Sequence, residues 1–108
     1  MGLATYRIEG DEFELVTIDA VVAEAGVGSA LLAVAKEVAA AEGCRRLWLI
    51  TTNDNLDALR FYQRRGLRIA AVHRDAVDRA RQIKPQIPAV GSSGIGIHDE
   101  LELECRVR

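Results

Sequence analysis

The chain has 108 residues, of which 49% are hydrophobic and 28% are charged, and its formal net charge is −2 at pH 7. A chain of this length predicts one domain that buries about 60–70% of its unfolded surface. The charge balance argues against a nucleic-acid-binding protein, which would carry a basic surface. No apolar run reaches the roughly 20 residues that span a bilayer. The residues after Met1 do not show the basic and then apolar pattern of a signal peptide. We therefore expect a cytoplasmic protein without a membrane partner.

Two strands joined by a tight turn are predicted at the start of the chain. Residues 3–9 alternate in character, and residues 12–20 are rich in apolar and β-branched side chains. Gly10-Asp11 lies between them, and a glycine in the first position favours a two-residue type II′ turn. The pattern therefore predicts an antiparallel hairpin. Its first strand has an uncovered edge, which invites pairing with another chain.

A glycine-bracketed turn, Gly26-Val27-Gly28-Ser29, comes next and leads into an alanine-rich helix. We expect this helix to run from Gly28 to about Glu42, where Gly43 ends it. Helical spacing predicts a buried face at Val27, Leu31, Val34, Ala35, Val38 and Ala39. Unpaired amide groups at the start of a helix, together with the helix dipole, favour a bound anion. The turn therefore predicts an anion-binding cradle.

A buried strand is predicted after this helix, because residues 47–52 form a continuous apolar run of strand length. Strand, helix and strand in this order predict a right-handed parallel crossover. Ligands of such units bind at the carboxyl ends of the strands. The glycine turn lies at that end, so the predicted cradle and the predicted ligand-binding edge coincide.

The second half of the chain begins with a capped helix. Asn53-Asp54-Asn55 offers capping side chains, and Gly66 ends the helix. Residues 67–73 are predicted to form the next strand.

The two cysteines, Cys44 and Cys105, have no other cysteine and no histidine nearby in the sequence. We therefore expect both to be core residues, with no metal site or redox pair.

The last third of the chain predicts a short helix, a loop and a strand. Ala76 to about Lys84 forms the helix, which ends before two prolines. Residues 91–96 are rich in glycine and serine and predict a loop. Residues 97–107 alternate between apolar and polar side chains, which predicts a half-exposed strand antiparallel to residues 67–73.

The glycine turn does not match two common phosphate-binding motifs. A dinucleotide fingerprint requires a third glycine where this chain has Leu31, and a nucleoside triphosphate loop requires a lysine that is absent here. Taken alone, the turn fits close packing of a helix against a strand as well as it fits phosphate binding. Evidence from other segments is needed to distinguish helix packing from phosphate binding.

Two further segments supply that evidence. One is the helix sequence Asn55-Leu56-Asp57-Ala58-Leu59-Arg60-Phe61-Tyr62-Gln63-Arg64-Arg65-Gly66-Leu67, and the other is the strand Leu47-Trp48-Leu49-Ile50-Thr51-Thr52. Together with the glycine turn, the chain from about residue 2 to the C-terminus resembles the GNAT superfamily of acetyl-CoA-dependent N-acetyltransferases. The resemblance implies an α/β (α+β) fold with a truncated GNAT-like mixed sheet: an antiparallel N-terminal hairpin, a βαβ crossover, a second helix and C-terminal antiparallel strands. Residues 1–108 would form a single domain, the cofactor-binding half of the family fold.

The resemblance also implies a set of residues around acetyl-CoA. Backbone amides around Gly26, Val27, Gly28, Ser29 and Ala30 would hold the pyrophosphate, and main-chain groups of Ile18, Asp19, Ala20 and Val21 would contact the pantetheine arm and the acetyl carbonyl. Asn55 would lie beside the cofactor, and Tyr62 would protonate the departing thiolate. The acetyl group would pass directly from this cosubstrate to an amine, without a covalent enzyme intermediate and without a metal.

The residue types suit this chemistry. A phenol with a pKa near 10 is protonated at neutral pH and can donate its proton to a thiolate. Glu14 and Asp19 are the carboxylates nearest the expected site, and either could take a proton from the amine, directly or through water. Structural roles stay open as well: helix packing for Tyr62, a helix cap for Asn55, and solvent exposure for the two carboxylates.

Two departures from the family pattern define an alternative. Ala23-Glu24-Ala25 stands where the family usually has glutamine or arginine and further glycine or basic residues, and Glu24 brings negative charge toward the pyrophosphate. The usual N-terminal strand and helix pair do not precede the hairpin. We expect either a homodimer, in which a second copy covers the edge of the first strand, or a catalytically silent remnant that acts as a coenzyme A-binding or protein-interaction module. Nothing in the sequence identifies the acceptor amine.

Overall fold

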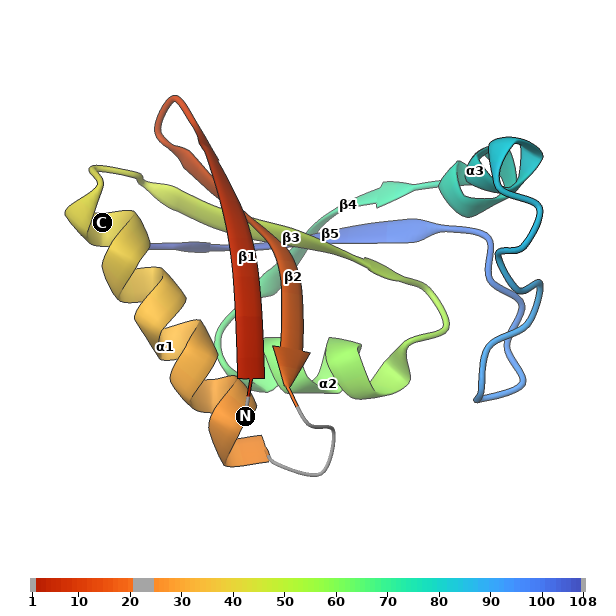
Figure 1. The fold of residues 1–108 in the computed structure, drawn as a ribbon, viewed down its shortest axis with the longest axis horizontal. Coiled ribbons are helices and arrows are strands. Elements are labelled where there is room, and N and C mark those ends of the chain that lie inside the picture. The colour runs from red at the N-terminus through yellow and green to blue at the C-terminus, as the bar shows by residue number, and fades with distance from the viewer. Residues whose placement is uncertain (1, 21–24, 108) are drawn as a thin grey trace. The chain divides into compact units, whose positions relative to one another are not determined.

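The computed structural model describes residues 2–20 and 25–107 (Figure 1). The chain divides into two compact units, residues 1–49 with 104–108 and residues 50–103, which are described in turn. The strands form a five-stranded sheet in the order β1-β2-β3-β5-β4. The order and the mixed strand directions confirm the predicted fold class. No helix among the described residues is both long and apolar enough to cross a membrane.

The first unit begins with the predicted hairpin of β1 (Gly2–Glu9) and β2 (Glu12–Ala20). Glu9 pairs with Glu12, so Gly10 and Asp11 form a two-residue turn. Gly10 has a φ of 62°, and Asp75 is the only non-glycine residue in the described part of the chain with a positive φ. A positive φ at the first turn residue alone is the signature of a type II′ turn. The predicted hairpin and its turn type are confirmed.

A β-bulge interrupts the hairpin. Thr5 pairs with Thr17, but Tyr6 pairs with Leu15, so Val16 is an extra residue on β2. A bulge of this kind bends the strand and increases its twist. The sequence does not predict this bulge, because no glycine marks the position and the side chains alone carry no signal for an inserted residue.

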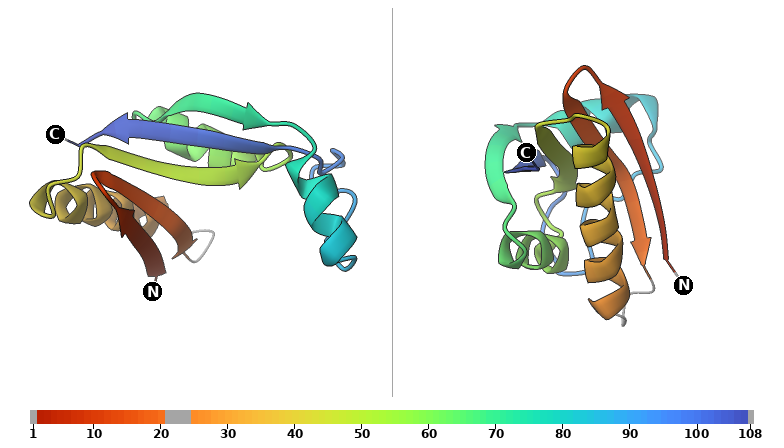
Figure 2. Two further views of the ribbon diagram at one scale, coloured as in Figure 1. Left: turned by 90° about the horizontal axis from the view of Figure 1, so that it is seen from above. Right: turned by 90° about the vertical axis from the view of Figure 1, so that its left-hand side faces the viewer.

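The helix α1 (Ala25–Ala41) packs against the hairpin (Figure 2). The predicted start at Gly28 was three residues too late. Its buried side chains are Leu32, Ala35 and Ala39, whereas Val34 is 54% exposed. The predicted face was therefore rotated toward Val34, since Leu32 rather than Leu31 points into the core. Several alanines and leucines on neighbouring positions make this stripe ambiguous from spacing alone.

The end of α1 forms a Schellman motif. Cys44 N donates to Ala39 O at 2.9 Å, and Gly43 N donates to Ala40 O at 3.1 Å. Gly43 has a φ of 80°, which only glycine adopts without strain. The predicted stop at Gly43 is confirmed. Cys44 follows it into the core as a buried free thiol, and Cys105 is half-buried.

The strand β3 (Arg46–Thr52) starts in the first unit and is tied to it at one end by backbone hydrogen bonds. Arg45 N donates to Asp11 O at 2.7 Å, and Val107 N donates to Arg45 O at 3.0 Å. No residue of β3 is exposed, but only Leu47 and Leu49 are fully buried. A strand buried on both faces was predicted. One face of β3 is buried at Leu47 and Leu49, whereas the side chains on the other face are only half-buried.

The second unit contains α2 (Leu56–Arg64), β4 (Arg68–His73), α3 (Ala76–Ile83) and most of the length of β5 (Glu100–Arg106). Its buried core residues are Tyr62, Leu67, Val77 and Leu103. β5 runs opposite to β3 and β4 (Figure 2), as predicted for β4. The predicted strand began at residue 97, but residues 97–99 are outside β5. Asn53 engages the backbone of His98 and Asp99 there.

Candidate functional site

The parallel strands β2 and β3 pair at the beginning of their length. Their described pairing covers three residue pairs, Glu12 with Arg46, Phe13 with Leu47 and Glu14 with Trp48. The bulge residue Val16 lies two positions further along β2. Ligands of α/β sheets bind at the carboxyl ends of strands, and backbone groups there that have no strand partner can contact a ligand.

The predicted pantetheine-contacting residues lie on this outer half of β2. Ile18, Asp19 and Ala20 pair with Ala4, Leu3 and Gly2 of β1. Val21 lies outside the described residues. So do Ala23 and Glu24, which belong to the segment that differs from the family pattern. The main chain of residues 18–20 thus has a defined partner on one side, and it follows the point where pairing with β3 ends.

The glycine turn lies within the first turn of α1, where it was predicted to precede the helix. Gly28 is buried, Ser29 is half-buried and Ala30 is exposed, and Gly26 and Val27 belong to the same helical turn. The first amides of a helix have no partner within it, so this position keeps its anion-binding potential. The earlier start of the helix moves the free amides toward residues 25–27.

Asn55 and Tyr62 lie on α2 of the second unit. Asn55 is the N-cap, and its Oδ1 accepts a hydrogen bond from Ala58 N at 3.2 Å, so the predicted capping role is confirmed. Seven positions separate the two residues, which places them on the same side of the helix two turns apart. The structural role of Asn55 leaves its Nδ2 group for other contacts.

Tyr62 combines a buried ring with an accessible hydroxyl group. The residue is 7% exposed and meets Phe61 edge-on, with 5.3 Å between ring centroids. Within the described part of the chain, the Tyr62 hydroxyl makes no hydrogen bond. Every fully buried side-chain oxygen or nitrogen there has a partner, so the Tyr62 oxygen is not fully buried and retains some contact with solvent. Burial raises the pKa of the Tyr62 phenol above its ordinary value. The group therefore holds its proton throughout the neutral range, as a proton donor must.

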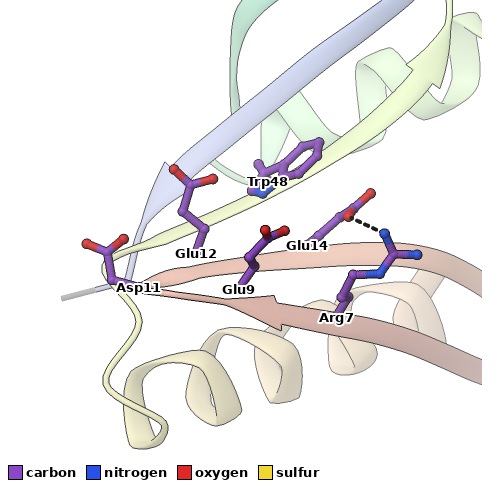
Figure 3. Close-up of a pocket in the computed structure, with 6 residues that line it drawn as sticks. All are labelled: Arg7, Glu9, Asp11, Glu12, Glu14 and Trp48. Carbon is purple, nitrogen blue, oxygen red and sulfur yellow. Dashed lines mark ion pairs between the residues drawn. The ribbon is translucent and has the colours of Figure 1, made fainter.

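Glu14 lines a cavity of about 250 Å³ in the first unit (Figure 3). The lining side chains are Arg7, Glu9, Asp11, Glu12, Glu14 and Trp48. Arg7 Nη1 lies 3.7 Å from Glu14 Oε1 across the hairpin. The cavity carries four carboxylates and one guanidinium, so its potential favours a cation. The side chain of Asp19, the other predicted proton acceptor, lies outside the described residues.

A second cavity, of about 190 Å³, lies at the start of α2 in the second unit. Its lining residues are Thr52, Asp54, Asn55, Leu56, Asp57, Ser92 and Ser93. Thr52 Oγ1 donates to Asp54 Oδ1 at 2.6 Å. Sequence reasoning found Asn55 but not the two serines, because a glycine- and serine-rich segment gives no signal for which element it will approach.

The comparison with known families is consistent with these features. The sequence model of the acetyltransferase (GNAT) family matches residues 1–67, which include the hairpin, the glycine turn, β3 and α2. The chain belongs to the GNAT acetyltransferase family. Two Bacillus subtilis (strain 168) proteins resemble this GNAT chain: YdhI is 46% identical over 94% of the chain, and YxbD is 44% identical over 95%.

A solved structure shares the fold of this GNAT chain. The GNAT family acetyltransferase from Elizabethkingia anophelis with acetyl-CoA bound superposes with a TM-score of 0.83, at 19% identity, over 97% of this chain and 67% of that one. The chain spans 63% of YdhI and 65% of YxbD, less than two thirds of either protein.

Proposed function

We propose that this chain transfers an acetyl group from acetyl-CoA directly to an amine of a small molecule or peptide, without a covalent enzyme intermediate. The observation that carries the proposal is membership of the GNAT family over residues 1–67. The GNAT structure that shares this fold holds acetyl-CoA, which supports the same cosubstrate here. The main chain of β2 after its described pairs with β3 offers groups for such a ligand.

In this proposal the roles follow the predicted residues. The main chain of Gly26, Val27, Gly28, Ser29 and Ala30 holds the pyrophosphate, chiefly through the first amides of α1, and the main chain of residues 18–21 contacts the pantetheine arm and acetyl carbonyl. Asn55 lies beside the cofactor. Tyr62 gives its proton to the thiolate as the carbon–sulfur bond of the thioester breaks, which suits a phenol kept protonated by burial. Glu14 or Asp19 accepts the proton that the attacking amine loses.

Binding and turnover test the proposal separately. Titration calorimetry with acetyl-CoA and a melting scan should both respond, since a ligand at 100 times its dissociation constant adds about 2.7 kcal/mol to the free energy of unfolding. Tyr62→Phe should lower kcat about 100-fold or more and leave the acetyl-CoA dissociation constant nearly unchanged. If millimolar acetyl-CoA neither releases heat nor raises the melting temperature, the proposed acetyltransferase activity is ruled out. Binding without acetyl transfer to any amine would favour the alternative of a silent coenzyme A-binding module.

We also propose a homodimer in which a second copy covers β1. This strand ends the sheet order, and its Tyr6 and Ile8 are 53% and 39% exposed. Tyr6 lines an apolar cavity of about 170 Å³ together with Leu31 and Val34 of α1. An exposed edge beside apolar side chains is a surface that association would bury. Light scattering at high concentration should give twice the chain mass, and a monomeric mass would rule out the dimer.

A further inference from the structure

A short hairpin in the second unit, the serine loop (residues 89–97), forms one wall of the 190 Å³ cavity. Val90 and Gly96 form an antiparallel bridge. Two more backbone hydrogen bonds join the limbs: Gly91 N donates to Ile95 O at 3.0 Å, and Ile97 N donates to Ala89 O at 2.9 Å. Ser92 and Ser93, at the tip, line the cavity. The tip is therefore a small ordered element whose position depends on what holds its base.

Arg81 of α3 holds that base. Its Nη2 donates to Pro88 O at 2.8 Å and to Ile97 O at 2.9 Å, and these carbonyls lie at the start and the end of the loop. Its Nε donates to Ile87 O at 3.1 Å. Nη1 donates to Asp78 Oδ1 at 2.8 Å, so a carboxylate on the same helix balances the charge. Two nitrogens of one guanidinium thus join both limbs of the hairpin to α3, while the third bonds Asp78, and the planar group with its fixed fork of donors suits such a set of contacts.

Asn53 fixes the second limb next to the cavity. Its Nδ2 donates to Gly96 O at 2.9 Å, and its Oδ1 accepts from His98 N at 2.9 Å and Asp99 N at 3.0 Å. Its neighbours in the sequence, Thr52 and Asp54, line the cavity. The loop is therefore held at its base by two side chains, Asn53 on the second limb and Arg81 on both limbs.

We propose that Arg81 is a positioning residue for the acceptor: it sets the place of Ser92 and Ser93, which contact the amine substrate in the cavity beside Asn55. This rests on the proposed acetyl transfer. The lining offers hydroxyl groups from Thr52 and the two serines and carboxylates from Asp54 and Asp57, without any lysine or arginine. Such a lining suits a polar, cationic amine that forms several hydrogen bonds, rather than an apolar arylamine.

The first arm of the test measures the loop itself. Arg81→Met removes the donors, and Arg81→Lys keeps the charge but lacks the planar fork. Arg79→Met is the matched control, because Arg79 lies on the same helix and its side chain donates to Arg74 O, outside the serine loop. Hydrogen exchange followed by mass spectrometry should show amides of residues 87–97 exchanging about tenfold faster in Arg81→Met, with exchange in α2 unchanged. Unchanged exchange at residues 87–97 would overturn the proposal.

The second arm separates the two substrates. With spermidine, lysine methyl ester and a peptide with a free amino terminus as probes, Arg81→Met should raise KM for the amine about tenfold while KM for acetyl-CoA stays constant. Arg81→Lys should show a smaller rise in the same parameter, and Arg79→Met none. Equal changes in both KM values, or a lower kcat alone, would contradict a positioning role toward the acceptor. If the unaltered protein acetylates none of the probes, the acceptor role falls with the proposed function, whereas the exchange data still decide whether Arg81 positions the loop.

Discussion

Glu14 of β2 and Trp48 of β3 form the last described pair between these parallel strands, and the extra residue of the hairpin bulge, Val16, follows Glu14 by two positions. A bulge of this kind bends a strand and increases its twist. The half of β2 that carries residues 18–20, with the predicted pantetheine contacts, therefore begins directly after a bend, and its described partner is β1.

Alkaline titration should identify Tyr62. A tyrosine in the unfolded chain has a pKa of about 10, and burial raises the pKa of Tyr62 in the folded state. Stability from this group is therefore complete below about pH 10 and declines as the pH rises through the folded-state value. The near-ultraviolet absorbance of tyrosinate should show a late step that Tyr62→Phe removes. A variant that keeps the late step would contradict the assignment.

Acid titration should reveal the Asp78 carboxylate on α3. Hydrogen bonds from His98 first, and from Arg81, hold the pKa of Asp78 below its ordinary value. His98 Nδ1 lies 3.0 Å from both carboxylate oxygens. Because the folded-state pKa is the lower one, this contribution to stability is present above about pH 3.9 and is lost as the pH falls through the folded-state value.

The melting temperature of the unaltered protein should therefore fall more steeply below about pH 4 than that of Asp78→Asn, which starts lower and changes less. Glu37→Gln, at an exposed carboxyl of α1, is the control and should follow the unaltered curve. Parallel curves for Asp78→Asn and the unaltered protein would show that the carboxylate has no special role in acid stability.

Gly91 is predicted to be required for the close contact between the serine loop and the Asp54 side chain. A Cβ atom at position 91 would lie 1.9 Å from Asp54 Oδ2 and 2.8 Å from its Cγ. The hydrogen bond from Thr52 holds Asp54 in place, so the clash cannot be relieved without losing that bond. Gly91→Ala should lower the free energy of unfolding by about 1–3 kcal/mol in urea titration.

A double variant tests the reason for that loss. In Asp54→Ala the obstructing atoms are gone, so adding Gly91→Ala should cost much less than it does in the unaltered protein. The coupling between the two substitutions should be about 1 kcal/mol or more. Additive effects would locate the strain elsewhere.

Arg46 is predicted to stabilise the first unit by joining two strands. Its Nη1 lies 3.2 Å from Glu12 Oε1 of β2, its Nε donates to Glu104 of β5, and its guanidinium lies 5.4 Å from the centroid of the Trp48 ring. Arg46→Met should lower the free energy of unfolding by about 1–3 kcal/mol, because two carboxylates lose their partner. Arg106→Met, at an exposed residue of β5, should change it by less than about 0.5 kcal/mol. Equal effects would mean that the Arg46 contacts contribute nothing net.

Features controlled by neighbouring residues could be predicted from the sequence. The Gly10-Asp11 turn, the stop at Gly43 and the cap at Asn55 each depend on one or two residue types whose backbone preferences are strong. The start of α1 was misplaced because glycines at 26 and 28 disfavour a helix locally, and tertiary packing overrides that preference.

The candidate site was only partly accessible from the sequence. Asn55 and Tyr62 could be named because a family resemblance covered their helix. The serine loop and its anchor Arg81 could not, since that anchor is a side chain bonded to carbonyls 6, 7 and 16 positions away. Contacts of a side chain with a distant main chain leave no periodic pattern, because any residue type supplies the acceptor.

The backbone bonds through Arg45 have a consequence for synthesis of the chain. Arg45 joins the hairpin turn at Asp11 to Val107, and the first unit consists of residues 1–49 with 104–108. At about 5–20 residues per second, roughly 3–11 seconds pass on the ribosome between residue 49 and residue 104. During this time the first unit lacks residues 104–108, and the backbone hydrogen bond between Val107 and Arg45 cannot form. The nascent hairpin and helix are therefore completed as a unit only after β5 has been translated.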